Sequence, residues 1–298
     1  MSVFLTGGTG FIGSSVLRRL IAEGHEVTAL VRSAEKAEAV QAEGATAVIG
    51  DITDAELVSD QARRSDGVIH TASPGDDTAQ AVEDAFVTAV FAGLEGSSRP
   101  YVHTSGIWIY GDNSDITESS EFNPPAASRW RLPIDERVRT AQGVHTSIVV
   151  PSIVYGYGRG LPTLISDAPR GSGVVPVLHL IGDGSQHWPT VHVDDLAALY
   201  VLALEQADAG SLHIGASGEN PTVRELGAAA ADAADIAGGD EAETVEATRA
   251  RLGRDFADAL MLDQQATGSG ARIEFGWEPN GPTLLDELAT GSYAPGRR

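Results

Sequence analysis

The chain has 298 residues, 42% of them hydrophobic, and no cysteine, which excludes disulfides, thiolate catalysis and cysteine-held zinc or iron–sulfur sites. Its 42 Asp and Glu against 20 Lys and Arg give a formal net charge of −22, so we expect neither nucleic acid nor an anionic membrane as a partner. No apolar run has the length of a membrane span. The first predicted strand begins directly after Met1, so we expect no signal peptide and a cytoplasmic protein.

A glycine-rich turn follows the first predicted strand. Residues 3–13 read as a short buried strand, a turn and the start of a helix. Gly7, Gly10 and Gly13 have the spacing in which the first glycine allows a tight turn, the second a close approach of the backbone to a pyrophosphate, and the third close helix–strand packing. The pyrophosphate would bind the free N–H groups at the helix N-terminus. The pattern predicts a dinucleotide cofactor, and its alternative is a structural strand–helix turn without a ligand.

The first half alternates predicted strands and helices with short connections. Helices are predicted over residues 14–23 and roughly 78–93, and later strands over 27–31, 45–49, 68–70, 101–105 and 146–150. This alternation predicts an α/β fold with a Rossmann-like, doubly wound parallel sheet. The ligand crevice of such a sheet lies beyond the carboxyl ends of its strands.

The second half is less regular. Residues 155–188 are rich in Gly and Pro and read as loops with one short helix, 194–206 as a helix and 211–214 as a strand. The stretch 226–258 is helix-forming but interrupted at Gly238 and Gly239. We therefore predict a Rossmann domain over 1–154 and a smaller, mostly helical C-terminal substrate lobe over 155–298, with 190–215 returning to the Rossmann core.

Six segments in order along the chain resemble the extended and atypical short-chain dehydrogenase/reductases, the epimerase/dehydratase branch: residues 6–13, 50–52, 103–111, 151–156, 188–197 and 275–279. The resemblance implies a nicotinamide cofactor site at the strand ends. The residues it places there are Gly7, Thr9, Gly10, Phe11, Ile12, Gly13, Arg32, Asp51, Ile52, Thr71, Ala72, Ser73, Thr104, Arg131, Pro151, Ser152 and Ile153.

The end of the second predicted strand indicates which cofactor binds. NAD sites place Asp or Glu there for the ribose 2′-hydroxyl, whereas this chain has Arg32, with Lys36 one helical turn on. A guanidinium suits a 2′-phosphate through charge-assisted contacts, and an Arg here is common in relatives that prefer NADP. We predict NADP(H), with NAD(H) as the alternative. The other interpretation of Arg32 is a solvated residue that opens a surface helix.

The family's catalytic pattern is broken. Classical members use a Ser or Thr, a Tyr and a Lys four residues later, but Lys36 is the only lysine of this chain. The equivalent segment aligns Ala127 with the tyrosine and Arg131 with the lysine, while Gly106 stands at the serine position. Pro133 predicts that the helix of this segment is remodelled or starts late.

Substitute groups are nevertheless present near the strand ends. We select Ser105, Tyr110 and Arg131 as catalytic candidates, with Arg131 hydrogen-bonding the nicotinamide ribose rather than donating a proton. His187 is expected in the same crevice. The eight histidines show no metal-ligand spacing, so no metal site is predicted.

Three functions remain open. The preferred one is an NADP(H)-dependent oxidoreductase acting on a small organic carbonyl or hydroxyl substrate through a non-standard proton donor. The second is a non-catalytic NADP-binding redox sensor or regulator. The third is a sugar-nucleotide epimerase or dehydratase. Either a monomer or a homodimer is compatible with the resemblance.

Overall fold

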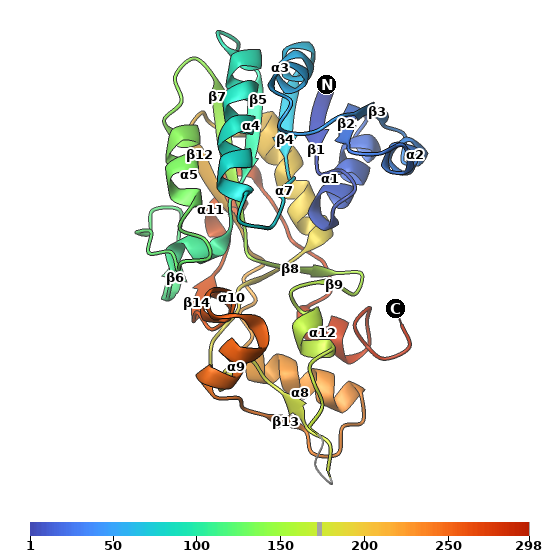
Figure 1. The fold of residues 1–298 in the computed structure, drawn as a ribbon, viewed down its shortest axis with the longest axis vertical. Helices are drawn as coiled ribbons and strands as arrows, with labels where there is room; N and C mark the ends of the chain where they lie inside the picture. Colours follow the sequence, from blue (N-terminus) through green and yellow to red (C-terminus); the bar gives the residue numbers. More distant parts are fainter. Residues whose placement is uncertain (172–174, 298) are drawn as a thin grey trace.

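The computed structural model describes residues 1–171 and 175–297. Its centre is a seven-stranded sheet of order β12-β7-β5-β4-β1-β2-β3 in which every neighbouring pair is parallel (Figure 1). The strands are β1 (Ser2–Thr6), β2 (Glu26–Val31), β3 (Thr46–Ile49), β4 (Gly67–His70), β5 (Pro100–Thr104), β7 (His145–Pro151) and β12 (Ser211–Gly215). The strand order reverses between β1 and β4, where a doubly wound sheet opens its ligand crevice. The predicted fold class is confirmed.

Helices cover both faces of this sheet. One layer holds α1 (Phe11–Ala22), α2 (Ala34–Ala42), α7 (Val193–Gln206) and α11 (Ser269–Phe275), and the other α3 (Ala55–Arg64), α4 (Ala79–Leu94) and α5 (Arg131–Arg139). Successive strand residues point to opposite faces, so Leu5 packs under the first layer and Phe4 under the second, both fully buried. Burial on both faces explains why the strands read as continuous apolar runs.

A smaller lobe lies beyond the carboxyl ends of the strands, below the sheet in Figure 1. Its core includes Leu180, Trp188 and Leu226. The segments outside the central sheet and its covering helices are the 3₁₀ helix η1 (Ile107–Tyr110), β6 (Asn113–Ile116), β8 (Ile153–Gly156), β9 (Arg159–Gly160), α6 (Thr163–Ser166), β10 (Leu178–His179), β11 (Thr190–His192), α8 (Val223–Ala233), β13 (Asp240–Glu241), α9 (Val245–Leu252), α10 (Arg254–Leu260), β14 (Gln264–Ala266) and α12 (Leu284–Ala289).

The chain leaves the main body and returns to it more than once. β12 pairs with β7 in the central sheet, and α7 packs against α1. The chain comes back again at α11, which packs on α7 and β12. This second return was not predicted.

Two local expectations can be refined. The stretch 226–258 is helical on both sides of an interruption at Gly238 and Gly239, as predicted, and the interruption is long: α8 ends at Ala233, and β13 lies before α9 and α10. The segment 155–188 does contain a short helix, α6, but β8 also pairs with β11 and β9 in a small sheet. Short strands of this kind lack the periodicity that identifies longer ones.

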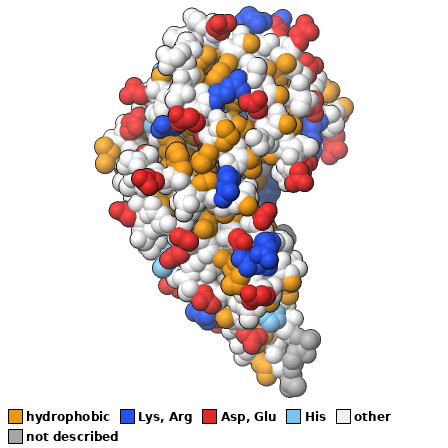
Figure 2. All heavy atoms as spheres, turned by 60° about the vertical axis from the view of Figure 1, so that its left-hand side comes forward, with side chains coloured by type: hydrophobic (Ala, Val, Ile, Leu, Met, Phe, Trp, Pro, Cys, Tyr) orange, Lys and Arg blue, Asp and Glu red, His pale blue; other side chains and the backbone are white. Residues whose placement is uncertain are grey.

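The surface matches the composition. Figure 2 shows Asp and Glu side chains spread over the visible face of both lobes, among fewer Lys and Arg. Among the described residues, no helix combines the length and the apolar character needed to cross a bilayer.

Candidate active site

The glycine-rich turn allows very close backbone approaches. Gly7 has φ +78°, and a Cβ there would lie 2.6 Å from Thr71 Oγ1. A Cβ on Gly13 would lie 2.1 Å from the carbonyl oxygen of Gly7, so α1 rests directly on the turn. The N–H of Gly10 donates to that same carbonyl at 2.7 Å. Larger side chains would fill this cradle, and the turn therefore fits the phosphate-binding geometry that its spacing predicts.

The N-terminus of α1 lies open beside this turn. The helix begins at Phe11, earlier than predicted. Its N-cap is the exposed Gly10, which has no side chain to cap the first N–H groups. Thr9 is half-buried next to it. Such a terminus combines unpaired donors with the positive end of the helix dipole, which suits an anion.

Arg32 and Asp51 follow two neighbouring strands, β2 and β3. Arg32 is exposed, and the following residue, Ser33, caps α2. Asp51 accepts hydrogen bonds from the N–H and Oγ1 of Thr53 at 2.9 and 2.7 Å. These bonds, and to a smaller extent the charge of Arg32, hold the pKa of Asp51 below its ordinary value. Asp51 is thus bonded to Thr53, and the exposed Arg32 makes no hydrogen bond to another described residue, so its donors remain available to a ligand anion.

A cleft of about 340 Å³ opens at the carboxyl ends of β1, β4, β5 and β7. Ile107, Trp108 and Leu161 form much of its apolar wall. From the predicted site it gathers Phe11, Ile12, Thr71, Ser73, Thr104, Ser105, Arg131, Pro151, Ser152 and Ile153. Its volume and mixed lining are those of a small-molecule site.

Ser105, on the cleft wall, is bonded to a buried carboxyl group. Its Oγ donates to Oδ2 of Asp135 at 2.6 Å. Asp135 is 2% exposed, and its Oδ1 has no hydrogen-bond partner among the described residues. Burial raises the pKa of Asp135 to about 6, although the Ser105 hydrogen bond and the charge of Arg131 oppose the shift. Asp135 therefore takes up and releases its proton around pH 6, well above the range of an ordinary Asp.

His103 lies behind Asp135, on β5. Its Nε2 is 3.6 Å from Asp135 Oδ1, and its Nδ1 is hydrogen-bonded to the hydroxyl of Tyr101 at 2.7 Å. Burial lowers the pKa of His103 to about 3, so the ring is neutral at physiological pH. Glu83, which pairs with His70 at 2.9 Å, lies near enough to contribute a negative charge that raises the pKa of Asp135 further. Among the described groups that shift the pKa of Asp135, Arg131 is the cation, and it lies at the cleft.

Arg131 is the first residue of α5 and lines the cleft. Its Nη1 donates to the carbonyl of Thr104 at 3.2 Å, and its guanidinium lies 4.4 Å from the centre of the Trp130 ring. Pro133 lies in the first turn of this helix, where a proline is tolerated. A guanidinium fixed in this way can bind an oxygen but cannot give up a proton.

Tyr110 is not brought to the cleft. Its side chain is 1% exposed, packs against Phe122 with ring centres 5.3 Å apart, and does not line the cavity. Burial raises the pKa of Tyr110, which makes it a poorer acid as well. We therefore do not retain Tyr110 as a proton donor.

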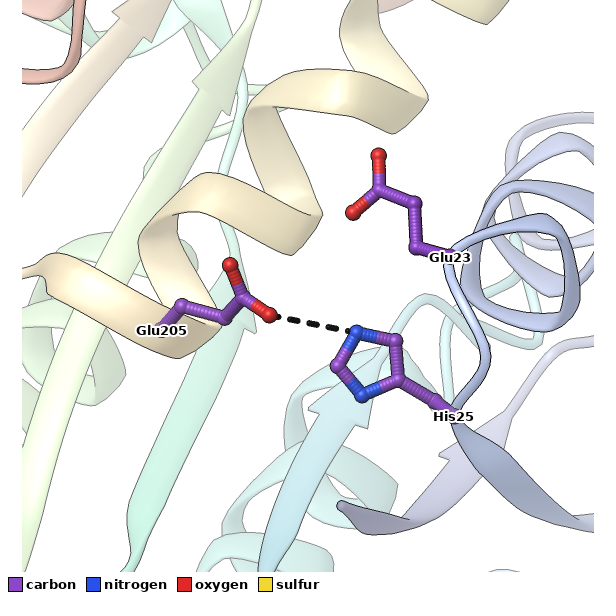
Figure 3. A group of neighbouring side chains, drawn as sticks. All are labelled: Glu23, His25 and Glu205. Carbon is purple, nitrogen blue, oxygen red and sulfur yellow. Dashed lines mark ion pairs between the residues drawn. The ribbon is translucent and has the colours of Figure 1, made fainter.

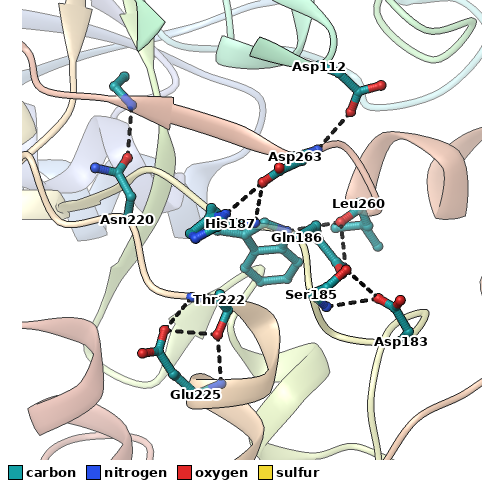
Figure 4. Close-up of polar contacts among 12 residues, drawn as sticks. Asp112, Asp183, Ser185, Gln186, His187, Asn220, Thr222, Glu225, Leu260 and Asp263 are labelled. Carbon is teal, nitrogen blue, oxygen red and sulfur yellow. Dashed lines mark hydrogen bonds and ion pairs between the residues drawn. The ribbon is translucent and has the colours of Figure 1, made fainter. Parts of the chain in front are cut away.

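His187 also lies elsewhere. Its Nδ1 and its backbone N–H both meet Asp263 Oδ1 at 2.8 Å, and it is not among the residues of the cleft (Figure 4). The neighbouring Trp188 is buried and donates its Nε1–H to the carbonyl of Leu260. Figure 4 shows Gln186 and His187 bonded to Leu260 and Asp263, at the end of α10 and in the connection to β14, which is a structural role.

Two polar residues of this site were not predicted from the sequence. Ser128 lines the cleft beside the aligned Ala127, and its buried Oγ has no hydrogen-bond partner within the described part of the chain. No sequence signal distinguished this serine from its neighbours. Asp135 stands one helical turn after Arg131, and that spacing on one helix face was a usable signal.

Comparisons with known proteins agree with this geometry. The model of the NAD dependent epimerase/dehydratase family matches residues 3–215. An uncharacterised protein of Schizosaccharomyces pombe is 36% identical over 234 residues, 76% of this chain and 78% of its own. The 2-alkyl-3-oxoalkanoate reductase of Stenotrophomonas maltophilia is 26% identical, over 76% of this chain and 73% of its own. A dTDP-glucose 4,6-dehydratase of Streptomyces venezuelae, crystallised with NAD, matches with a TM-score of 0.76 at 23% identity, over 98% and 96% of the two chains.

Proposed function

Because this chain belongs to the NAD dependent epimerase/dehydratase family, we propose that it is an NADP(H)-dependent oxidoreductase that interconverts a carbonyl and a hydroxyl group on a small organic substrate. The observation that carries the proposal is the hydrogen bond from Ser105, on the cleft wall, to the buried Asp135. It provides an acid–base group where the family's tyrosine and lysine are replaced by Ala127 and Arg131.

The cofactor would lie along the strand ends. The turn at Gly7, Gly10 and Gly13 would hold the pyrophosphate, and the exposed Arg32 would hold the 2′-phosphate of NADP. A bound nicotinamide dinucleotide would supply or accept the hydride. NAD(H) remains the alternative ligand, and the comparison of the two is the direct test of Arg32.

Two side chains would orient the reacting groups. Arg131, fixed by Thr104 and Trp130, presents its remaining N–H groups to the cleft, where a ribose or substrate oxygen can accept them. Ser128 offers a hydroxyl that has no hydrogen-bond partner among the described residues. An apolar wall containing Trp108 and Leu161 then favours a substrate with an apolar part beside its oxygen.

In the reductive direction, Asp135 would begin with a proton on its carboxyl group. Ser105 passes its own hydroxyl proton to the substrate oxygen as that oxygen becomes an alcohol, and takes the carboxyl proton in exchange. The serine is then unchanged, Asp135 is a carboxylate, and one O–H bond has formed on the product. Solvent reprotonates Asp135 after product release. The oxidative direction reverses each transfer.

One relative has a chemistry that suits the cleft. The S. maltophilia relative is named for the reduction of a 2-alkyl-3-oxoalkanoate, an oxo group next to an alkyl chain. This chemistry fits an apolar cleft with one proton donor. A sugar-nucleotide dehydratase is the alternative, because a dTDP-glucose 4,6-dehydratase of Mycobacterium tuberculosis is 31% identical over 222 residues, 65% of this chain. We favour the reductase because the cleft has an apolar wall and because Lys36 is the only lysine of the chain.

The test is NADPH oxidation by the purified chain against a panel of 3-oxo acids, alkyl ketones, aldehydes and nucleotide sugars. We expect turnover with one apolar oxo class and its loss in Ser105→Ala. If NADPH binds at micromolar concentration but is consumed with no member of the panel, the regulator becomes the better account. Turnover that survives Ser105→Ala unchanged removes the proposed proton path.

A further inference from the structure

A second group of ionisable side chains lies at the amino ends of the strands, on the opposite side of the sheet from the cleft. Glu23 is the C-cap residue of α1, His25 immediately precedes β2, and Glu205 stands in the last turn of α7. Figure 3 shows the two carboxylates and the imidazole converging on the space between these two helices. One ligand atom from each residue lies within 4.8 Å of the other two.

His25 is the informative member. It is only 8% exposed, and neither ring nitrogen has a hydrogen-bond partner among the described residues. Its Nε2 nevertheless lies 3.2 Å from Glu205 Oε1, so the oxygen is close without being aligned for a hydrogen bond. A buried polar atom left without a partner is costly, which makes the arrangement unusual for a structural pair.

That spacing is typical of two ligands on one metal ion. With metal–ligand bonds of 2.0–2.1 Å, neighbouring donors at a tetrahedral angle stand about 3.3 Å apart. Neither donor then points at the other, because both point at the ion. The contact between His25 and Glu205 has this form, and a ligand atom of Glu23 lies within 4.8 Å of both.

The local charge also favours a cation. The C-terminal ends of α1 and α7 both lie here, and each carries the negative end of a helix dipole. Two carboxylates add to that field. Arg19 contacts Oε1 of Glu23 and offsets part of this negative charge. The second oxygen of the same carboxylate, Oε2, is the one left for the ion. Both glutamates are partly exposed, so an ion from solvent can reach them.

We propose that Glu23, His25 and Glu205 bind one divalent transition-metal ion of the zinc class, with water completing the coordination. Imidazole nitrogen and carboxylate oxygen are ligands that such ions accept, and a cysteine-free chain offers no thiolate site to compete. The ion fastens the end of α1 to the end of α7. The sequence predicted no metal site because Glu205 lies far along the chain from the other two ligands.

Calorimetric titration of ZnCl₂ into the full chain, first freed of metal with a chelator, tests the site at neutral pH. We expect one ion per chain, and a melting temperature raised by about 5 °C when zinc is at 100 times its Kd. His25→Gln and Glu205→Gln should each weaken binding at least tenfold. Arg19→Ala should strengthen it, because it removes a competing cation.

His179→Gln is the matched control, since His179 faces Glu241 at 3.8 Å in the other lobe and should leave zinc affinity unchanged. Circular dichroism and NADPH titration verify that each variant is folded. Cobalt provides a second readout, because a four- or five-coordinate ion gives visible absorption bands that His25→Gln should abolish. The proposal is overturned if the wild type binds no zinc, or if wild type and His25→Gln bind it with equal affinity. The contact between His25 and Glu205 is then an ion pair. Neither result bears on the oxidoreductase assignment.

Discussion

Ser105 Oγ and Asp135 Oδ2 lie 2.6 Å apart and join the wall of the cleft to a carboxyl group that is 2% exposed. β5 ends directly before Ser105, and Asp135 lies in α5, so the contact depends on the packing of that helix against the sheet. It places an ionisable group beside the cleft, where the sequence aligns Ala127 and Arg131 with the tyrosine and lysine of the family.

Removing either partner should reduce turnover. A positioned general acid contributes typically about 10²–10⁴-fold, so we expect Ser105→Ala and Asp135→Asn each to lower kcat by about 10²-fold or more, with a smaller change in KM. Steady-state kinetics with the substrate found in the panel measures this. Asp84→Asn is the matched control, because that carboxylate pairs with Arg137 between α4 and α5 away from the cleft. A similar loss in this control would mean that helix packing, and not proton transfer, limits the rate.

The pH dependence of reduction should follow Asp135. The reductive step needs the protonated carboxyl, whose pKa burial raises to about 6. We therefore expect kcat for reduction to fall as pH rises above about 6, and the oxidative rate to rise over the same range. The Asp135→Asn variant should lose this limb of the profile while keeping a low residual rate. A wild-type profile that stays flat between pH 5 and 8 would contradict the assignment.

The same carboxyl should affect folding stability. Its pKa rises from an ordinary 3.8 to about 6, so the folded state holds the proton more tightly than the unfolded state. The stabilisation is complete below the ordinary value and is lost as pH rises through 6, by roughly 3 kcal/mol in total. Chemical denaturation from pH 4 to 8 should show this loss in the wild type and not in Asp135→Asn. Equal slopes for the two proteins would exclude the effect.

Arg32 should set the preference between cofactors. A hydrogen bond to a charged group is worth about 1.5–3 kcal/mol, so Arg32→Ala should raise the Kd of NADPH at least tenfold and leave that of NADH nearly unchanged. Fluorescence titration with each cofactor measures the ratio. Arg64→Ala, an exposed arginine on α3 paired with Asp60, serves as the control. An equal loss for both cofactors would assign Arg32 a general structural role.

Replacement by alanine should be tolerated less well at a glycine of the turn than at another glycine of the cleft. Gly13→Ala would bring a methyl group to 2.1 Å from the carbonyl oxygen of Gly7, so cofactor binding and stability should both fall sharply. Gly106→Ala is the matched comparison, because its φ is −173° and a Cβ there meets nothing within 4 Å. We expect this second variant to melt within a few degrees of the wild type. A thermal melt and an NADPH titration of both variants check the contrast.

The sequence predicted the sheet well because its signals are local. Apolar runs bounded by short connections gave the strands that meet at the crevice, and the glycine spacing identified the turn over α1. Pro133 lies in the first turn of α5, which is compatible with a helix that begins close to it. Each of these features depends on residues within one or two turns of chain.

The rest required contacts between distant segments. Tyr110 follows β5 closely, as a cleft residue should, but the 3₁₀ turn directs its side chain into the core beside Phe122. Asp135 acquires its chemistry from burial against Ser105 and His103, which no sequence pattern encodes. Ser128 differs from other serines only in facing the cleft without a partner among the described residues.

The repeated return of the chain to the sheet constrains how this molecule can be rebuilt. A fragment that stops at residue 154 would lack β12 and α7, so β7 would become an open edge and the apolar side of α1 would face water. The lobe that shapes the cleft is therefore not a detachable cap. To exchange it for another specificity, an engineer would need to splice the chain on both sides of the segment from α7 to β12, and again around α11. Those pieces would have to come from the original body.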